Sequence, residues 1–484
     1  MSRINTNVTS LIAQNNLHRS NNDLSTSLQR LSTGLRINRG ADDPSGLIVS
    51  ERLRSEIAGI EQAVDNAERA SNVIATAEAA LQEINNLLND LKALTVEAAN
   101  TGGFSEAEIE ANQLQIDSAL DSITRISNTT SFAGLKLLNG SLDYLTSGVP
   151  TSAIGNVKVF GANFGTNANL PVTVETLNSA QTATLFVSGL GTSQFASSVT
   201  FEVQGVKGVQ VFSFVSGTAL SAVVFAVNQV SDATGVSASL VNGGLASGFR
   251  LDSEEYGSDA FVSLRKINDG DFLQTYDALG GAGAAVNRDT GQDVLALVNG
   301  TLALGDGLRV QLRTAVLDIQ LNLTAGAATT LASHAFTITG GGANYQIGPS
   351  VNAQQQVGVG IQSVAASSLG DEITGYLISV GSGGDNSLVA GGAQAASQII
   401  DLAIDQVSVL RGRLGAFERN TLQTTIRSQQ IALENLTAAE SQIRDADFAY
   451  ETARLTRAQI LVQAGTSTLG LANSSAQSVL SLLQ

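Results

Sequence analysis

Apolar residues recur every seven positions near both ends of the 484-residue chain, and polar residues fill the positions between them. Heptad spacing puts apolar side chains on one narrow stripe of a helix and predicts coiled coils. Because such a stripe cannot bury itself, each helix needs another helix to cover it. We expect rod packing at Ile60, Ile74, Leu81, Leu88, Ile400, Val407, Leu414 and Phe417.

The C-terminal stripe contains a phase slip. Apolar positions that end at Phe417 resume at Leu422 and Ile426, out of step with those before them. A further helix is predicted around Ile116 and Ile123. Packing the segment near residue 60 against the segment near residue 410 is the simplest way to cover both stripes.

The outermost segments, residues 1–42 and 448–484, are rich in Asn, Ser, Gln and Ala, with isolated apolar residues at helical spacing. Burying one Leu or Ile gives about 1.5 to 3 kcal/mol, and fixing each backbone residue costs about 1 to 2 kcal/mol. We therefore expect these arms to be disordered in a free monomer and to order against neighbouring copies. The predicted polymerisation core is Leu17, Leu24, Leu28, Leu31, Leu35, Ile460, Leu461, Leu469, Leu471, Val479 and Leu480.

The middle of the chain has a different period. Residues 156–160, 172–176 and 335–339 alternate as strands, and helical spacing resumes at Ala393. The predicted fold class is α+β: long antiparallel coiled-coil helices from both chain ends, short β-strands beside the rod, and a β-rich central outer domain. The expected domains are an N-terminal arm (1–42), an N-terminal rod (43–180), a central variable domain (181–334), a C-terminal rod (335–447) and a C-terminal arm (448–484).

Both ends carry motifs that resemble bacterial flagellin. At the N-terminus these are residues 4–7, 28–38, 41–43 and 46–47, and at the C-terminus residues 441–447, 455–473 and 479–484. Where that family commonly has a small residue, this chain has Pro44, which suits a helix end or the first turn of the next helix. Within the central domain, residues 212–228 and 233–240 resemble the small strand–helix–strand motif of flagellin and hook-associated inserts.

The resemblance implies a structural subunit that polymerises into the extracellular flagellar filament for swimming motility, after unfolded export by the flagellar type III apparatus. It implies partners as well: the chain itself, the filament cap and the hook-associated proteins. A hook–filament junction protein is the alternative, since it has similar ends. An enzyme displayed on a filament is the other.

Two further surfaces follow from the resemblance. The segment from Leu455 to Gln484 matches the one by which flagellins bind an export chaperone as amphipathic helices. The segment around Leu88, Lys92 and Leu94 matches the one read by the vertebrate innate immune receptor. Asp90 stands where strongly stimulatory flagellins have Arg, and Gln115 aligns near a usual Glu, so we expect weak receptor signalling.

Composition offers little catalytic chemistry. The chain has no Cys, and its two histidines, His18 and His334, fall in different predicted domains, so neither a zinc site nor a Cys–His pair is expected. We predict no cofactor. Asp445 and Asp447 are interpreted as charges near a helix start rather than metal ligands. A net charge of −17 argues against nucleic acid as a partner.

Other features fit an exported subunit. Residues 2–20 lack the basic and apolar regions of a secretory signal peptide, and the chain has no run of 18 apolar residues, so no membrane span is expected.

Ser and Thr of the central domain are candidate O-glycosylation sites. Gly34 near the arm-to-rod joint serves either filament switching or helix capping. Arginines such as Arg30 are either ordinary surface charge or partners of Asp42, Asp43 and Glu51 in neighbouring copies.

Overall fold

A computed structural model describes the chain except for residues 1–5, 101, 166, 189–193, 242–247, 269–273, 279–283, 315, 372–373 and 482–484, and except for the side chains of 475–481. The chain forms two compact units. The helical unit comprises residues 1–71, 346–351 and 417–484, and the mixed unit comprises residues 72–345 and 352–416.

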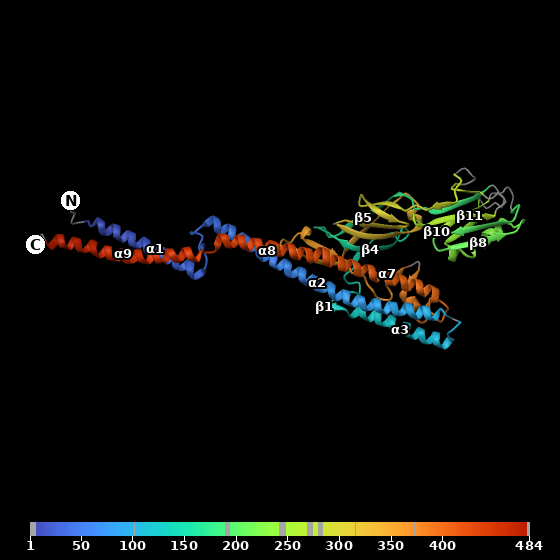
Figure 1. Ribbon diagram of the computed structural model, residues 1–484, viewed down its shortest axis with the longest axis horizontal. Coiled ribbons are helices and arrows are strands. Elements are labelled where there is room, and N and C mark those ends of the chain that lie inside the picture. The colour runs from blue at the N-terminus through green and yellow to red at the C-terminus, as the bar shows by residue number, and fades with distance from the viewer. Residues whose placement is uncertain are drawn as a thin grey trace. The chain divides into compact units, whose positions relative to one another are not determined.

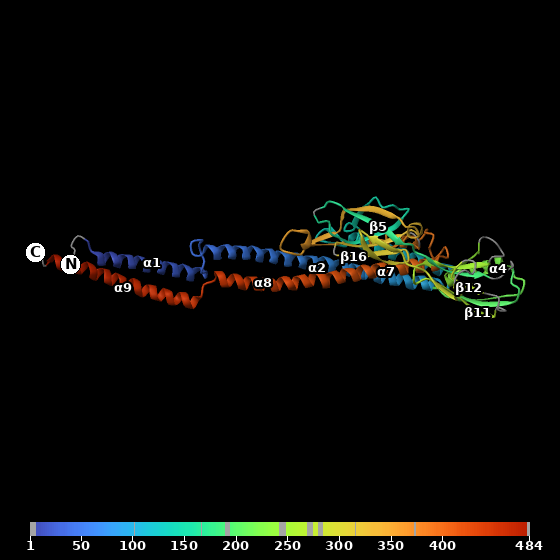
Figure 2. The same cartoon turned by 90° about the horizontal axis from the view of Figure 1, so that it is seen from above.

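The helical unit consists of two antiparallel helix pairs. In one, α1 (Val8–Thr33) lies beside α9 (Phe448–Ser481), as Figures 1 and 2 both show. In the other, the first half of α2 (Pro44–Ala98) runs beside α8 (Gln423–Arg444). Two contacts fix that second pair: Ser71 Oγ donates to Glu418 Oε1 at 2.7 Å, and Arg444 Nη1 lies 2.7 Å from Glu51 Oε1.

Residues 346–351 pack against α2 and α8. A Cβ added at Gly59 would lie 3.1 Å from Pro349 Cβ, and Gln429 Nε2 donates to the Ile347 carbonyl at 2.9 Å. The position beside residue 60 is therefore near residue 429. The expected packing of residue 60 near residue 410 was wrong, because this short segment and the antiparallel register of α2 and α8 set the neighbours.

A π-helical turn, Glu418–Leu422, joins α7 (Ala393–Phe417) to α8. A π turn holds more residues than an α turn, so the residues after it are shifted around the helix axis. This turn is the phase slip predicted after Phe417, and Leu422 is buried at its end.

Three helical segments of the mixed unit bury their stripes. They are α2 from residue 72 onward, α3 (Glu106–Thr129) and α7. A capping box of Ser105 and Glu108 starts α3. Lys92 of α2 pairs with Asp401 of α7, and Arg411 Nη2 lies 3.9 Å from Glu78 Oε1. The fully buried apolar residues of these helices include Ile74, Leu81, Ile84, Leu88, Leu91, Ile116, Ile123, Ile399, Ile400 and Val407.

One lobe of the mixed unit is an eight-stranded antiparallel sheet in the order β3-β18-β5-β14-β15-β16-β17-β4, with the short helix α6 (Ala325–Ala328) packed on it. Alternate residues such as Val172, Val174, Ile319 and Leu321 point into its core. Its strands are β3 (Tyr144–Ser147), β4 (Ile154–Ala162), β5 (Leu170–Asn178), β14 (Leu295–Val298), β15 (Thr301–Asp306), β16 (Arg309–Arg313), β17 (Leu317–Leu323) and β18 (Ser333–Gly341).

This lobe extends further along the chain than the expected boundaries. Strands β14 to β17 lie within residues 181–334, the expected central domain, yet β14 pairs with β5 and β17 with β4. Alternation of apolar and polar residues identifies a strand but does not indicate which sheet the strand joins, so these four strands could not be assigned to this sheet from the sequence. The returning strand β18 pairs with β5 and β3, so residues 335–339 form a strand as predicted.

A second lobe, residues 182–291, which we call the inserted lobe, has two four-stranded sheets, β12-β6-β10-β9 and β13-β11-β7-β8. Phe195, Phe201 and Phe249 are fully buried in its core. Its elements are β6 (Thr182–Ser188), β7 (Val199–Gln204), β8 (Val209–Phe214), α4 (Leu220–Asn228), α5 (Ser231–Thr234), β9 (Val236–Leu240), β10 (Phe249–Tyr256), β11 (Phe261–Asn268), β12 (Gln274–Tyr276) and β13 (Arg288–Thr290).

The inserted lobe begins and ends at one pair of residues. Gln181 and Gln292 exchange two backbone hydrogen bonds of 2.9 Å, the pattern of a hydrogen-bonded antiparallel pair. The chain thus enters and leaves the inserted lobe at adjacent positions.

The shorter remaining elements are β1 (Ser131–Phe132), β2 (Leu135–Lys136), β19 (Ala343–Gln346), β20 (Gln356–Val359), β21 (Gly370–Asp371), β22 (Gly375–Tyr376) and two 3₁₀ turns (Ala353–Gln355 and Leu377–Val380).

Candidate assembly surface

The pair α1 and α9, which we call the arm hairpin, is held at both ends by polar contacts. Asn7 Nδ2 donates to the Ala472 carbonyl at 3.0 Å. About twenty residues along α1, Ser27 Oγ donates to Glu451 Oε2 at 3.1 Å. The two helices therefore run antiparallel and in contact over most of their length.

The seam of the arm hairpin follows a heptad on both helices, in which a row of small residues alternates with a row of larger ones. A Cβ added at Gly465 would lie 3.3 Å from Leu17 Cδ1, so a large residue of one helix fills the space left by a small one. Seam residues are all buried or half-buried: Ser10, Ala13, Leu17, Ser20, Leu24, Ser27 and Leu31 on α1, and Glu451, Leu455, Ala458, Val462, Gly465, Leu469 and Ala472 on α9.

Large apolar side chains off this seam remain exposed. Ile460 is 62% exposed and Leu471 is 72% exposed, whereas heptad residues of the rod such as Leu81 are fully buried. Several large apolar side chains exposed on one helix pair indicate an interaction site. The exposed set on the arm hairpin is Val8, Leu11, Ile12, Leu28, Phe448, Tyr450, Ile460, Leu461 and Leu471.

The predicted polymerisation core therefore divides between two surfaces. Leu17, Leu24, Leu31 and Leu469 lie in the seam, and Leu35 is half-buried just past α1. Leu28, Ile460, Leu461 and Leu471 face outward. The side chains of Val479 and Leu480 lie outside the described residues.

Both arms are helical in the structure, and the disorder that we expected of them in a free monomer stays a prediction. The small seam residues let the two helices approach closely and cover each other, a pairing that the stripe of large residues alone does not indicate. The two arm helices cover each other along this seam, and their outward apolar residues stay uncovered within the chain.

The joint between arm and rod is made by backbone contacts. Gly34 caps α1 with φ of +72° and donates to the Arg30 carbonyl at 2.8 Å. Arg36 N donates to the Arg444 carbonyl at 2.7 Å, and Ala446 N donates to the Gly34 carbonyl at 2.9 Å. Helix capping thus accounts for Gly34, since a positive φ costs glycine little.

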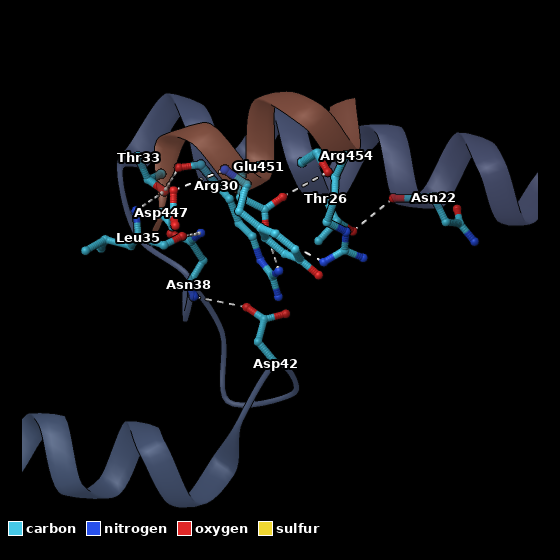
Figure 3. Close-up of polar contacts among 12 residues, drawn as sticks. Asn22, Thr26, Arg30, Thr33, Leu35, Asn38, Asp42, Asp447, Glu451 and Arg454 are labelled. Carbon is cyan, nitrogen blue, oxygen red and sulfur yellow. Dashed lines mark hydrogen bonds and ion pairs between the residues drawn. The ribbon is translucent and has the colours of Figure 1, made fainter. Parts of the chain in front are cut away.

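Glu451 is the centre of a polar cluster beside this joint (Figure 3). Its side chain accepts from Arg30 Nη1 at 2.8 Å and from Ser27, and Arg454 Nη1 lies 3.7 Å away. The residue is only 3% exposed. Burial acts to raise the pKa of Glu451, but the hydrogen bonds from Arg30 and Ser27 and the charges of Arg30 and Arg454 outweigh it, so the pKa is lowered.

The neighbouring aspartates cap backbone groups of their own chain. Asp42 accepts from Arg39 N at 2.9 Å and from Asn38 N, bonds that lower its pKa. Asp43 accepts from Gly46 N at 2.9 Å, where Pro44 occupies the first turn of α2 as predicted. These bonds and the Glu51–Arg444 pair are contacts within one chain, rather than the pairing between copies considered above.

Asp447 starts α9, because its side chain accepts from Tyr450 N at 3.1 Å. This confirms the helix-start interpretation for Asp447. Asp445 instead ends α8, where it accepts from Ser441 Oγ at 2.6 Å. Among the described residues, no group of three His, Asp or Glu side chains could hold a metal ion.

Of the predicted rod residues, Ile60, Ile74, Leu81, Leu88, Ile400, Val407 and Leu414 are buried and Phe417 is half-buried. In the segment that resembles a receptor site, Asp90 and Gln115 are exposed and Leu94 is half-buried. Lys92 is half-buried, donates to Ser397 Oγ at 2.7 Å and pairs with Asp401.

Our reasoning from sequence missed Glu451 and Ser27. A signal was present: residues 451, 458, 465 and 472 recur at steps of seven. Because they are Glu, Ala, Gly and Ala, a search for large apolar residues passes over them.

Comparisons with known proteins agree at both ends. The family model for the bacterial flagellin N-terminal helical region matches residues 4–143, and that for the C-terminal helical region matches residues 397–483. The B-type flagellin of Pseudomonas aeruginosa is 33% identical over 99% of both chains. The chain belongs to the bacterial flagellin family.

Other relatives extend the match. The flagellin of Salmonella rubislaw is 30% identical over 99% of both chains, and flagellin B of Helicobacter pylori is 30% identical over 100% of this chain and 99% of its own. The flagellin hook IN motif matches residues 198–253, which confirms the predicted strand–helix–strand motif, seen here as β8, α4 and β9.

Among solved structures, hook associated protein-3 of Legionella pneumophila is 14% identical over 81% of this chain and 98% of its own, with a TM-score of 0.31. The flagellar cap protein domains of Escherichia coli give a TM-score of 0.28 at 20% identity, over 40% of this chain and 97% of theirs. Within the described residues, no helix is both long and apolar enough to cross a membrane.

Proposed function

We propose that this flagellin is the structural subunit of the extracellular flagellar filament and that it polymerises through its arm hairpin, serving swimming motility. The outward apolar residues of α1 and α9 carry this proposal, because both helices already pack their small seam residues against each other. Copies stacked side by side cover what one hairpin leaves exposed. Repeated contacts of this heterologous kind give an open helical array.

Removal of either arm tests the proposal. Variants lacking residues 1–42 or 448–484 are expected not to grow filaments from short seeds, as seen by electron microscopy and sedimentation, while the full chain grows long ones. A matched control deletes a larger but unrelated part: residues 182–291 replaced by Asn-Gly, a two-residue turn that suits a hydrogen-bonded strand pair such as Gln181–Gln292.

The outcome separates two classes of subunit. If an arm-deleted variant polymerised as well as the full chain, the arm hairpin would not be the assembly surface. If the full chain added only a few copies to a seed and stopped, the alternative of a hook–filament junction protein would replace the filament subunit. Filament cap and hook-associated proteins are the further partners that we propose at the filament ends.

The domain assignment that we propose follows this role. Residues 1–42 and 448–484 form the filament core, 43–180 and 335–447 form the rod, and 181–334 form the variable part outside it. The boundary at residue 180 crosses the eight-stranded sheet, because β14 pairs with β5 and β17 with β4. We propose unfolded export through the flagellar type III apparatus. Support comes from the absence of cysteine, since a chain without disulfides has no covalent obstacle to unfolding.

An export chaperone is proposed to hold Leu455–Gln484 before assembly. The outward Ile460, Leu461 and Leu471 are suited to an apolar groove, by the helix-in-groove mode. Chaperone and neighbouring subunits then compete for the same residues. Replacing Ile460 and Leu471 by Ser should weaken both chaperone binding, measured by calorimetry, and filament growth.

Weak signalling through the vertebrate innate receptor for flagellin is proposed for the segment around Leu88 to Leu94 and Gln115. Asp90 is exposed and acidic at a position where a basic residue supports strong stimulation, and Lys92 is engaged with Asp401. Purified monomer in a receptor-reporter assay should be much less potent than its Asp90→Arg variant. Full potency of the unaltered monomer would contradict this.

A further inference from the structure

Lys158 of β4 is a lysine whose ammonium group has no direct partner. The neighbouring Val159 points into the core of the eight-stranded sheet, so Lys158 points to the opposite face, where its side chain is half-buried. Within the described part of the chain, its Nζ takes part in no hydrogen bond and no ion pair. A lysine partly removed from water and without a partner is the kind that takes part in covalent chemistry.

The remaining lysines of the chain differ from Lys158 in partner or in exposure. The chain has five lysines, of which Lys266 is exposed. A hydrogen bond to Glu254 raises the pKa of Lys207, which keeps that amine protonated. Three of the five have a polar partner, which is Asp401 for Lys92, the Thr129 carbonyl for Lys136 and Glu254 for Lys207.

Lys158 lines a cavity of about 350 Å³. Its walls are the face of β4 that bears Lys158, the loop of residues 362–370, and α7 through Gln406 and Leu410. Gln406 holds the loop in place, because its Nε2 donates to the Gly370 carbonyl at 2.9 Å and its Oε1 accepts from Gly370 N at 3.0 Å. A cavity of this size suits a small molecule, and hydroxyl groups line it from Ser363, Ser367, Ser368 and Tyr376.

A carboxyl group shares this cavity with the amine. Asp143 lines it, and burial raises the pKa of Asp143 against the effect of its hydrogen bond from Tyr144 N. Burial lowers the pKa of Lys158, the charges of Asp371 and Asp143 oppose this, and the charge of Arg309 adds to it. One cavity therefore holds an amine that loses its proton more readily than usual and a carboxyl that keeps its proton more readily than usual.

We propose that Lys158 is a covalent capture site for small hydroxylated aldehydes, which it binds as an imine, with Asp143 as the proton donor for the loss of water. The hydroxyl-lined walls bind the hydroxyl groups of the aldehyde. All of these residues belong to the mixed unit, so the site is independent of the arms and of assembly.

Both groups of the cavity act in imine formation. The lone pair of neutral Nζ bonds to the carbonyl carbon, and the proton that the nitrogen loses passes to the carbonyl oxygen. The carboxyl of Asp143 then protonates this hydroxyl, the C–O bond breaks as water leaves, and the nitrogen lone pair forms the C=N bond. The Asp143 carboxylate takes back the proton from the iminium nitrogen. Amine and aldehyde thus give imine and water, with no oxidation or reduction.

Reductive labelling of the full-length subunit tests the proposal. Glyceraldehyde at limiting concentration with sodium cyanoborohydride turns each imine into a stable adduct, which peptide mass spectrometry assigns to its lysine. At neutral pH, Lys158 should be labelled at least about tenfold faster than Lys207, because each unit of pKa difference gives about tenfold more neutral amine. In guanidinium chloride, which unfolds the chain, the five lysines should react at similar rates.

Asp143→Asn separates the amine from its proton donor. The variant should slow aldehyde labelling of Lys158 about tenfold or more, because the acid that removes the hydroxyl is lost. Acetylation of Lys158 by an N-hydroxysuccinimide ester needs no such acid. It should proceed as fast as before or faster, since loss of a nearby negative charge favours the neutral amine. As a matched control, Asp385→Asn at an exposed position should change neither rate.

Equal labelling of Lys158 and Lys207 in the folded chain would overturn the proposal, and so would a preference for Lys158 that persisted in guanidinium chloride. Asp143→Asn would also overturn it by slowing both reagents alike, because the carboxyl would then only shape the cavity. The comparison among lysines of the unaltered chain needs no variant, so it decides even where Asp143→Asn fails to fold.

Discussion

The rod helices and the arm hairpin share the same heptad spacing but differ in how far the chain buries their large apolar residues. In α2, α3 and α7, most large residues of the stripe, such as Leu81, Ile123 and Val407, are fully buried against other parts of the same chain. In α1 and α9 the intramolecular seam uses many small residues, and large ones such as Ile12 and Ile460 stay exposed. Heptad spacing therefore indicates which helices pair. The size of the heptad residues indicates whether the pair buries all of its large apolar side chains within one chain.

The largest effect is expected in the rod. Leu81→Ala removes a fully buried side chain and should lower the free energy of unfolding by about 2 to 5 kcal/mol, because the cavity cannot collapse fully. Urea unfolding followed by circular dichroism measures this. A change below about 1 kcal/mol would mean that the rod stripe is not a packed core, and the contrast with the arms would disappear.

A substitution on the outward face of the arms should affect polymerisation rather than the stability of the monomer. Ile460→Ser is expected to change the free energy of unfolding of the monomer by less than about 0.5 kcal/mol. The critical concentration for polymerisation should rise roughly tenfold or more, since burial of an Ile in the filament gives about 1.5 to 3 kcal/mol. Sedimentation of seeded samples measures it. Gln459→Ser, at an exposed polar neighbour, is the control.

A substitution at the joint between arm and rod should have an intermediate effect on stability. Gly34→Ala should destabilise the arm hairpin by about 1 kcal/mol, because φ of +72° strains alanine although no atom lies within 4 Å of the new Cβ. Gly470→Ala, also in open space but inside α9, should instead raise helicity. Circular dichroism at increasing temperature distinguishes the two. Equal effects would show that α1 does not depend on its cap.

The smallest effect is expected from pH. The pKa of Glu451 is lowered below its ordinary value of 4.5, so its contribution to stability is complete above that value and is lost as pH falls through the folded pKa. The wild-type arms should exceed Glu451→Gln in thermal stability near neutral pH, and the difference should vanish in strong acid. A difference that persisted after full protonation of the carboxylates would contradict the ionised pair.

The ease of predicting each part from sequence depended on residue size. Leu81 and Leu88 are large, so their spacing indicated the rod helices, and the slip after Phe417 was visible for the same reason. In the arm seam only the row of large residues was visible from the sequence, because the small Ala458 and Gly465 carry little hydrophobic signal. Strands β14 to β17 were assigned to the central domain because alternation defines a strand and leaves its sheet open.

The π turn at Glu418–Leu422 has a consequence for how this helix tolerates change in length. Elsewhere in α7 or α8, losing one residue rotates everything beyond it by about 100° and turns the apolar stripe away from its neighbours. Within the π turn, the same loss converts a wide turn into an ordinary one and leaves the orientation of the following helix nearly unchanged. Single-residue insertions and deletions between homologous chains should therefore collect at this turn, and an alignment by heptad alone would misplace every position after it.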